Sequence, residues 1–324
     1  MKVAITGGAG FLGTALARRL LAAEALTVNG GQHSLDELLL ADLVPPPADL
    51  TADGRVVPVV GELTDALERV AAADLVFHLA GVVSGAAEAD FDLGMATNVT
   101  ATLALLEACR RGARTPVVVF SSSLAVFGAE PGDGPLRVVS DDTLPRPQTS
   151  YGIQKFIGEQ LIADFTRKGF LDGRSVRLIT VTVRPGRPNA AASSFLSGII
   201  REPLAGERAV CPVPPDTPVA VSSPRRTLDG ILAAAAATQA TWGGRTAVTL
   251  PALSTTPAAM VDALARVGGE HLRDLIDWTP DPTIAAIVTG WPAEVRATRA
   301  AALGLLPETS FEDIVRAYLD DLQR

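Results

Sequence analysis

Tyr151 and Lys155 stand four positions apart in the segment YGIQK, within a predicted helix. Residues at this spacing project from the same face of a helix, so the phenol and the ammonium group would lie together. An unperturbed phenol titrates at a pKa of ~10, and bringing that pKa to about 7 takes roughly 4 kcal/mol, which close positive charge can supply. Tyr151 is therefore predicted to be a general base that removes a proton from a substrate hydroxyl.

Ser123 is the last serine of the segment FSSSLAVFG and directly follows a predicted strand. Ligands of open parallel sheets bind outside the carboxyl ends of the strands, so Ser123 would share a crevice with Tyr151. Its hydroxyl can donate a hydrogen bond to the reacting oxygen while Tyr151 removes the proton. The neighbouring Ser121 and Ser122 can instead satisfy the amides of the turn.

A glycine-rich segment, TGGAGFLG, follows the first predicted strand and opens the first predicted helix. In that context Gly7, Gly10 and Gly13 allow a tight turn, a close approach of the backbone to a pyrophosphate, and packing of the helix on the strand. The helix N-terminus adds unpaired N–H groups and positive potential. The segment predicts a dinucleotide site, while a plain strand-to-helix turn is the alternative.

Asp42 ends the second predicted strand, where a carboxylate accepts hydrogen bonds from ribose hydroxyls and repels a 2′-phosphate. Asp42 therefore favours NAD over NADP, and its alternative role is to cap a turn. Glu62 and Leu63 follow the third strand, where the adenine is expected. Ala80 and Gly81 follow the fourth strand, where small residues leave room for the cofactor. The predicted NAD contacts are Gly7, Gly10, Phe11, Leu12, Gly13, Asp42, Glu62, Leu63, Ala80, Gly81, Ser121, Tyr151, Lys155 and Pro185.

Apolar runs alternate with helical patterns through the first half of the chain, which is typical of a parallel sheet covered on both faces. We expect an α/β fold with a Rossmann-like, doubly wound parallel sheet and a smaller, mainly helical C-terminal substrate region. The expected domains are 1–185 for NAD and 186–324 mainly for the substrate, with some later segments packing back on the first domain. Residues 25–36 are predicted to be a solvated insertion. The predicted strands are 2–6, 37–42, 55–60, 74–80, 116–122 and 177–183, and the predicted helices are 11–24, 62–72, 89–112, 150–169, 193–204, 227–239, 257–268, 292–304 and 309–322.

The composition is that of an acidic protein with ample material for a core, since 48% of its 324 residues are hydrophobic and its net charge is −8. It has no Lys/Arg block, so neither nucleic acid nor a membrane surface is expected as a partner. Cys109 and Cys211 match no disulfide or metal spacing, and three scattered histidines predict no metal site. His78, in an apolar strand, is predicted to be packed and hydrogen-bonded. Because no signal-peptide core is present, we expect a cytoplasmic location.

Five motifs in this order, TGGAGFLG, HLAG, FSSSLAVFG, YGIQK and RPG, resemble the extended short-chain dehydrogenases/reductases, a group that includes nucleotide-sugar epimerases and dehydratases. The resemblance covers essentially the whole chain and implies a catalytic triad of Ser123, Tyr151 and Lys155. This chain departs from the group at two positions. It has Phe127 where the group commonly has a tyrosine, and Glu62 where the group commonly has an aspartate. These departures weaken a sugar-nucleotide substrate more than they weaken NAD binding.

The same resemblance implies two further features. Asn98 matches an asparagine that often supports the lysine of the triad through water. The predicted helices 89–112 and 150–169 would pair with a second copy of the chain in a four-helix bundle. A homodimer is therefore expected.

Four further segments of the chain are SSLAVFG, RKGFLDGRSVRL, RPGRPNAAASSFLSGIIREPLAGE and CPVP. They resemble the D-erythronate dehydrogenase family, whose members oxidise the C2 hydroxyl of a four-carbon sugar acid with NAD. This narrower resemblance implies oxidation of D-erythronate to 2-oxo-tetronate. Small residues after the sixth strand let the backbone approach a substrate, and Arg187 or Arg225 could pair with its carboxylate. The predicted substrate contacts are Ser84, Ser123, Tyr151, Arg187, Asn189, Ser193 and Arg225.

Two other functions fit the same motifs. A nucleotide-sugar epimerase would use the same three residues to oxidise a sugar and would then return the hydride to it. A catalytically silent regulator would bind NAD without turnover. Net formation of NADH separates the dehydrogenase from both.

Overall fold

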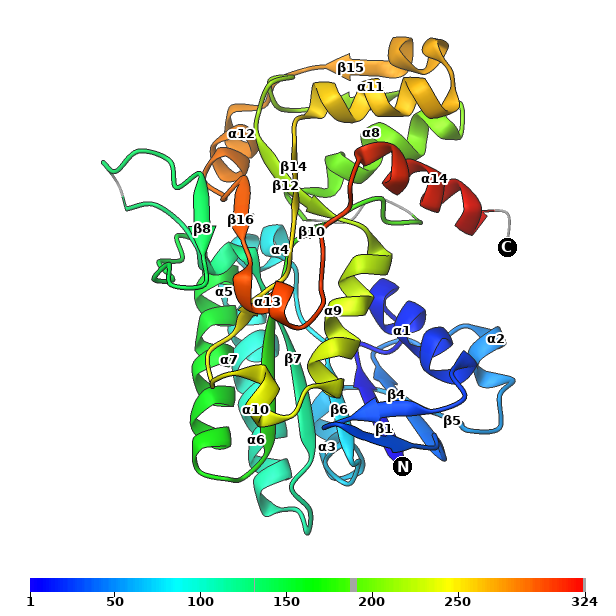
Figure 1. Ribbon diagram of the computed structural model, residues 1–324, viewed down its shortest axis with the longest axis vertical. Coiled ribbons are helices and arrows are strands. Elements are labelled where there is room, and N and C mark those ends of the chain that lie inside the picture. The colour runs from blue at the N-terminus through cyan, green and yellow to red at the C-terminus, as the bar shows by residue number, and fades with distance from the viewer. Residues whose placement is uncertain (131, 187–190, 323–324) are drawn as a thin grey trace.

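A seven-stranded parallel sheet forms the centre of the computed structural model, which describes residues 1–130, 132–186 and 191–322. The strand order is β5-β4-β1-β6-β7-β9-β13, so the chain builds outward on one side of β1 and then on the other (Figure 1). This order confirms the predicted Rossmann-like α/β fold. The strands of the sheet are β1 (Lys2–Thr6), β4 (Glu37–Asp42), β5 (Val56–Val60), β6 (Leu75–His78), β7 (Val117–Ser123), β9 (Asp172–Leu178) and β13 (Val248–Thr249).

Helices cover both faces of the sheet (Figure 1). One face packs against α1 (Phe11–Ala22) and α9 (Pro224–Ala236). The other face packs against α3 (Leu63–Ala71), α6 (Ala101–Arg111) and α7 (Ser150–Arg167). Successive side chains of a strand point to opposite faces, and both faces are buried here, which is why the strands read as continuous hydrophobic runs.

A second, smaller core lies over the carboxyl ends of the strands (Figure 1). It is built mainly from α8 (Ser194–Leu204), α11 (Pro257–Gly268) and α14 (Phe311–Leu322). No helix within the described ranges is long and apolar enough to span a membrane. The remaining helices and strands are β2 (Leu26–Val28), β3 (Gly31–His33), α2 (Ala48–Thr51), α4 (Ser84–Ala89), α5 (Phe91–Gly94), a π-helical segment (Met95–Thr100), a 3-10 turn (Leu124–Val126), β8 (Val138–Ser140), β10 (Thr180–Val181), β11 (Ala209–Cys211), β12 (Val219–Ser222), α10 (Gln239–Trp242), β14 (Leu253–Thr255), a second 3-10 turn (Glu270–Leu275), β15 (Ile276–Trp278), α12 (Pro282–Thr289), β16 (Glu294–Arg296) and α13 (Thr298–Ala302).

The prediction of a strand at 177–183 is wrong in its bounds, because β9 already begins at Asp172. This strand carries two buried arginines, which argue against a central strand when the sequence is read alone. Arg174 donates to both carboxylate oxygens of Asp172, at 2.5 and 2.9 Å. Arg177 donates to both carboxylate oxygens of Glu159, at 2.8 Å each. Buried ions are tolerated in a sheet when they are paired in this way.

Residues 25–36, the predicted solvated insertion, are mostly exposed and form a β-hairpin of β2 and β3. Asn29 and Gly30 make its turn with φ values of 48° and 77°, left-handed conformations that these two residue types adopt most readily. Their backbone N–H groups donate to the last two carbonyl groups of α9, each at 2.8 Å. The hairpin therefore satisfies the C-terminal end of a helix that covers the sheet.

Two of the predicted helices need comment. The helix predicted at 89–112 is present as a continuous helical run from Phe91 to Arg111, and its hydrogen bonding changes to the π-helical pattern over Met95–Thr100. Within 292–304 only α13 is helical, because the residues before it pair with β8 as the strand β16. Finally, α9 and β13 come from the predicted second domain and pack back on the sheet, as we expected of some later segments. The boundary between 185 and 186 stays a prediction.

Candidate active site

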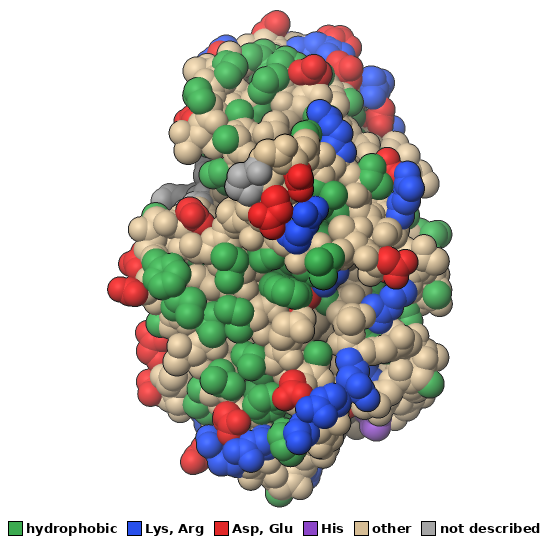
Figure 2. Space-filling view, turned by 90° about the vertical axis from the view of Figure 1, so that its left-hand side faces the viewer, with side chains coloured by type: hydrophobic (Ala, Val, Ile, Leu, Met, Phe, Trp, Pro, Cys, Tyr) green, Lys and Arg blue, Asp and Glu red, His purple; other side chains and the backbone are tan. Residues whose placement is uncertain are grey.

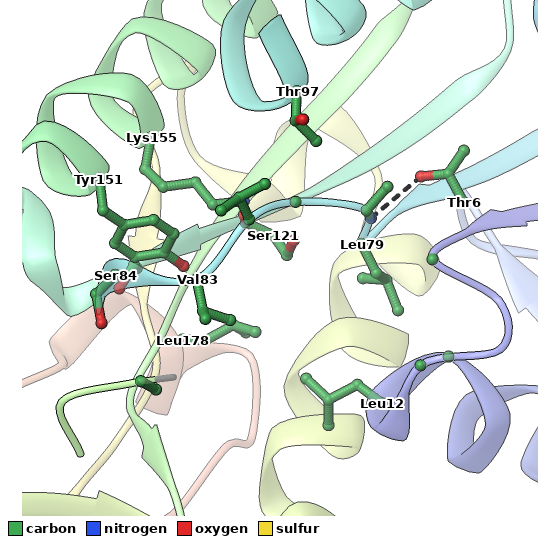
Figure 3. Close-up of a pocket in the computed structure, with 18 of the residues that line it drawn as sticks. Thr6, Leu12, Leu79, Val83, Ser84, Thr97, Ser121, Tyr151, Lys155 and Leu178 are labelled. Atoms are coloured by element: carbon green, nitrogen blue, oxygen red, sulfur yellow. Dashed lines mark hydrogen bonds between the residues drawn. The ribbon is translucent and has the colours of Figure 1, made fainter. Parts of the chain in front are cut away.

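A cavity of about 950 Å³ opens at the carboxyl ends of the sheet strands. Figure 3 shows Ser84 and Tyr151 at one end of the cavity and Thr6 and Leu12 at the other. Most of the predicted site residues meet here, although they come from many separate elements. The predicted residues that line the cavity are Gly7, Gly10, Phe11, Leu12, Gly13, Asp42, Glu62, Leu63, Ala80, Gly81, Ser84, Ser121, Ser123, Tyr151, Lys155 and Ser193.

The glycines of the first turn form a cradle with no room for side chains. A Cβ at Gly13 would lie 2.0 Å from the carbonyl oxygen of Gly7, and one at Gly7 would lie 2.8 Å from the backbone nitrogen of Ala80. Gly7 also has a φ of +73°, in the left-handed region. Gly10 precedes α1 without a side-chain cap, so the N–H groups of the first helical turn can bind a ligand. The cradle fits the pyrophosphate of a dinucleotide.

Asp42 lies at the end of β4, beside the glycine cradle. Its Oδ2 accepts a hydrogen bond from the backbone N–H of Ala9 at 2.9 Å. The turn contact that was the alternative role of Asp42 is therefore present, and the carboxylate also lines the cavity. Glu62 and Leu63, at the start of α3, line it as well. This part of the cavity is acidic, as a site for ribose hydroxyls without a 2′-phosphate should be.

Helix α7 brings both Tyr151 and Lys155 to the cavity (Figure 3). The helix is capped by Thr149, whose hydroxyl oxygen accepts a hydrogen bond from the backbone N–H of Gly152 at 3.1 Å. Lys155 Nζ donates to the carbonyl oxygen of Ser121 at 2.8 Å and lies 5.8 Å from the centre of the Tyr151 ring. Burial lowers the pKa of Lys155 to about 8, so the side chain is protonated in most molecules at pH 7.

Ser123 and Arg184 line the same cavity as Tyr151 and affect the ionisation of its phenol. Burial raises the pKa of Tyr151, while a hydrogen bond with Ser123 and the positive charge of Arg184 lower it. Ser123 Oγ also accepts a hydrogen bond from the backbone N–H of Ala125 at 3.1 Å. That contact orients the hydroxyl and leaves its proton for donation to another oxygen.

Asn98 is buried behind the cavity, in the π-helical segment. Its Oδ1 accepts from the backbone N–H of Val82 at 2.9 Å, and its Nδ2 donates to the Val82 carbonyl oxygen at 3.1 Å and to Gln154 Oε1 at 2.8 Å. A Cβ at Gly81 would lie 3.0 Å from Asn98 Oδ1 and 3.3 Å from Lys155 Nζ. Asn98 therefore fixes the loop after β6 beside the lysine, and π-helical segments are frequent at functional sites. Its support of the lysine through water stays a prediction.

His78 is buried and hydrogen-bonded, as predicted. Its Nδ1 lies 2.7 Å from Thr6 Oγ1, and its Nε2 lies 2.9 Å from Thr102 Oγ1. Burial, and secondly the charge of Lys155, lower the pKa of His78 to about 3. The imidazole is therefore neutral at pH 7 and joins β1 and β6 to α6.

Some predicted site residues do not reach the cavity. Pro185 is exposed in the turn after the sixth predicted strand, and Arg225 is exposed in the first turn of α9, so neither lines the cavity. Arg187 and Asn189 lie outside the described residues. The lining residues that the sequence analysis did not single out include Thr6, Thr97, Arg184 and Trp291. For Arg184 a signal was available, because it is the polar residue that opens the RPG turn.

The model of the NAD dependent epimerase/dehydratase family matches residues 3–222, which is more than half of the chain. The chain belongs to this family. Membership in the NAD dependent epimerase/dehydratase family confirms the resemblance to the extended short-chain group and the prediction of NAD as the cofactor. The prediction of an NAD-dependent dehydrogenase is confirmed as well, because relatives over the full length of the chain are dehydrogenases.

Two curated relatives within the family are similar over nearly their whole length. A D-erythronate dehydrogenase of Cupriavidus necator is 49% identical over 325 residues, which cover 99% of this chain and 98% of the relative. A D-erythronate dehydrogenase of Haemophilus influenzae is 40% identical over 332 residues, which cover 99% of each chain. Both matches extend through the C-terminal region, beyond the part that the family model covers.

Solved structures of similar proteins show the same fold. A nucleoside-diphosphate-sugar epimerase from Agrobacterium tumefaciens is 38% identical with a TM-score of 0.90, covering 99% of this chain and 94% of that one. An L-threonine 3-dehydrogenase from Trypanosoma brucei has a TM-score of 0.84 at 23% identity, covering 99% of this chain and 96% of that one. At that identity the likeness concerns the fold alone.

Proposed function

We propose that this protein oxidises the C2 hydroxyl of a short sugar acid with NAD, and that the acid is D-erythronate, which would give 2-oxo-tetronate. The observation that carries the proposal is the meeting of Ser123, Tyr151 and Lys155 in the cavity that begins at the glycine cradle. The relatives from C. necator and H. influenzae support the choice of substrate, because each matches 99% of this chain.

NAD would lie along the cavity from the glycine cradle toward Tyr151. The N–H groups at the start of α1 would bind its pyrophosphate, and Asp42 would accept hydrogen bonds from its adenosine ribose. Lys155 already donates to Ser121 and has further N–H groups for the second ribose. When bound, NAD supplies the ring carbon that accepts the hydride from C2.

Tyr151 is the proposed general base. Ser123 would donate a hydrogen bond to the substrate oxygen and so direct the hydroxyl proton toward the phenolate oxygen of Tyr151, where that proton binds. Burial opposes ionisation of the phenol. Bringing the pKa of a free phenol from ~10 to about 7 takes roughly 4 kcal/mol, and the nearby charges of Lys155 and Arg184 are the groups of the protein that can contribute it.

The two tyrosines of the chain provide a matched test of this assignment. Tyr151→Phe should lower kcat by roughly 100-fold to 10,000-fold, the usual contribution of a general base, while NAD binding is retained. Tyr318→Phe removes the same hydroxyl from a tyrosine on α14 that does not line the cavity, and should keep activity close to wild type. Equal activity of wild type and Tyr151→Phe would refute the assigned base.

A nucleotide-sugar epimerase is the second candidate, favoured by the A. tumefaciens structure at 38% identity. Such an enzyme returns the hydride to its substrate and accumulates no NADH. A panel of four- to six-carbon sugar acids and nucleotide sugars, followed at the NADH absorbance band with NAD and with NADP, decides between them. NAD binding without turnover of any compound would instead support the catalytically silent regulator.

The homodimer is part of the same proposal. Phe91, Leu103 and Ile153 lie on α5, α6 and α7 and are 60%, 39% and 47% exposed. Figure 2 views the molecule from the left-hand side of Figure 1, where α5 and α7 lie, and shows hydrophobic side chains gathered on that face. An exposed apolar face of this kind marks a surface for association. Light scattering should give twice the mass of one chain, and Leu103→Glu with Ile153→Glu should give the mass of a monomer.

A cytoplasmic location is proposed on the need for NAD and on the two buried cysteines, which are unpaired.

A further inference from the structure

Arg184 brings a positively charged side chain to the cavity beside Tyr151. It follows β10 and lines the cavity together with Tyr151, Ser84 and Ser193. The positive charge of Arg184 favours ionisation of the Tyr151 phenol, so the two groups act on each other within one cavity. Arg184 therefore faces the same cavity as the proposed general base.

The guanidinium of Arg184 has hydrogen-bonding capacity that the described part of the chain does not use. Its Nη2 is buried and has no hydrogen-bond partner among the described residues. Burial, and secondly repulsion by Arg201, lower the pKa of Arg184, and no described carboxylate acts against them. Because a buried cation without a counter-ion is unfavourable, an anion bound at this place would be stabilised.

The other charged side chains that line the described cavity are less suited to bind an anion. Asp42 and Glu62 carry negative charge at the end of the cavity assigned to adenosine. Lys155 donates to the carbonyl oxygen of Ser121 and is assigned to the ribose. Among the lining residues that the structure describes, Arg184 is thus the cation left for a substrate.

We propose that Arg184 binds the carboxylate of the sugar-acid substrate. This inference rests on the proposed function, in which Tyr151 takes the proton of the C2 hydroxyl. The carbon that bears this hydroxyl is bonded directly to the carboxylate carbon, so the partner of the carboxylate has to face the cavity that holds the general base. Arg184 lines that cavity together with Tyr151. A planar guanidinium can donate two parallel hydrogen bonds to a carboxylate, which fixes the orientation of C2 as well as its position.

Helix α8 holds the backbone of Arg184 in place. The backbone N–H of Arg184 donates to Ser197 Oγ at 3.1 Å, and its carbonyl oxygen accepts from Arg201 Nη1 at 2.8 Å. Both partners lie on α8, which belongs to the second, smaller core. The C-terminal region therefore contributes to the site by fixing the arginine that selects an acid.

The test compares wild type with Arg184→Gln and Arg184→Lys, using NAD and either D-erythronate or its neutral amide. In Arg184→Gln, kcat/KM for the acid should fall roughly 10- to 100-fold, the loss expected when a hydrogen bond to a charged group is removed. Its kcat/KM for the amide and its affinity for NAD should stay close to wild type. Arg184→Lys should recover part of the loss, because it restores the charge without the planar pair of donors. Arg226→Gln, at an exposed arginine on α9, is the matched control and should behave as wild type.

Three outcomes would overturn the assignment of Arg184 while leaving the proposed function intact. They are an unchanged kcat/KM for the acid in Arg184→Gln, an equal loss for acid and amide, and a loss of acid preference in Arg225→Gln instead. If Arg184→Gln does not fold, as judged by NAD binding, Arg184→Lys is compared with wild type in its place. Arg184→Lys must then discriminate less well than wild type between the acid and the amide. A wild-type protein that oxidises no sugar acid would overturn the proposed function and this inference together.

Discussion

Replacing Lys155 with methionine should make the protein more stable at pH 7 in the absence of NAD, while it removes turnover. The side chain of Lys155 is only 4% exposed and lies close to the rings of Phe120 and Tyr151. Its single hydrogen bond with a described residue is the one to Ser121. Methionine is unbranched and apolar, so it can occupy much of the same space without a charge. In the proposed mechanism the lysine therefore serves the reaction at the expense of stability.

The size of this effect follows from the pKa. Burial lowers the pKa of Lys155 from 10.5 to about 8. At 1.36 kcal/mol per pKa unit, a difference of about 2.5 corresponds to about 3 kcal/mol of destabilisation by the charged form. Loss of the hydrogen bond to Ser121 offsets about 1 kcal/mol. The variant should therefore gain about 2 kcal/mol in free energy of unfolding at pH 7.

The sign of the pH dependence is also determined. Below pH 8 the folded protein holds a buried cation, and the destabilisation is fully present. Between pH 8 and 10.5 the unfolded chain binds more protons at this lysine than the folded chain does, so the stability of wild type rises relative to the variant. Near pH 10 most of the effect of the charge should be gone, and the advantage of the variant should disappear.

Urea unfolding of both proteins at pH 7 and pH 10, without NAD, measures this difference. Other titrating groups are common to both proteins and cancel in the comparison. Lys168→Met makes the same chemical change at the exposed end of α7 and should alter the free energy of unfolding by less than about 0.5 kcal/mol at either pH. Two results would show that the buried charge of Lys155 does not destabilise the protein. One is a Lys155→Met variant that is less stable than wild type at pH 7, and the other is the same difference in free energy of unfolding at both pH values.

Three further perturbations follow from the described contacts. Glu159→Gln leaves the buried Arg177 without its counter-ion and should lower the free energy of unfolding by about 3–5 kcal/mol, whereas Arg167→Gln, in an exposed pair on the same helix, should lower it by less than about 1 kcal/mol. Similar losses in these two variants would contradict the role of the buried pair. Gly13→Ala places a methyl group on the Gly7 carbonyl and should weaken NAD binding by roughly 10-fold or more in calorimetric titration, and unchanged affinity would rule out the glycine cradle as the pyrophosphate site. Asp42→Asn should raise the ratio of kcat/KM for NADP over NAD by at least about 10-fold, and a constant ratio would show that Asp42 does not set the cofactor preference.

The parts of the fold that follow simple patterns could be predicted from the sequence. Apolar runs fixed the positions of the first five strands of the core, because strands buried on both faces are almost entirely hydrophobic. The glycine spacing located the start of α1, and the four-residue spacing of Tyr151 and Lys155 placed both side chains in one cavity. In each case a short local pattern was enough to determine the structure.

The misplaced elements depend on partners that are distant in the chain. β9 contains Arg174 and Arg177, and these residues suit a buried strand because Arg174 also donates to the Ala237 carbonyl oxygen and Arg177 donates to Glu159 on α7. The hairpin at 25–36 packs against the end of α9, some 200 residues later in the chain. Arg184 was overlooked for a similar reason, since its place in the cavity depends on hydrogen bonds to α8. Periodicity does not contain such information.

The return of α9 and β13 to the sheet has a consequence for recombining this enzyme with its relatives. α9 contacts β7, β9, α1 and β2, and β13 forms the edge of the sheet beyond β9. In a chimaera joined at residue 186, α9 and β13 would come from one protein and the sheet from another, so their contact surfaces would not match. Exchange of the two halves would therefore disturb folding before it altered specificity, and a new substrate preference is better sought by redesigning the residues around Arg184 and α8.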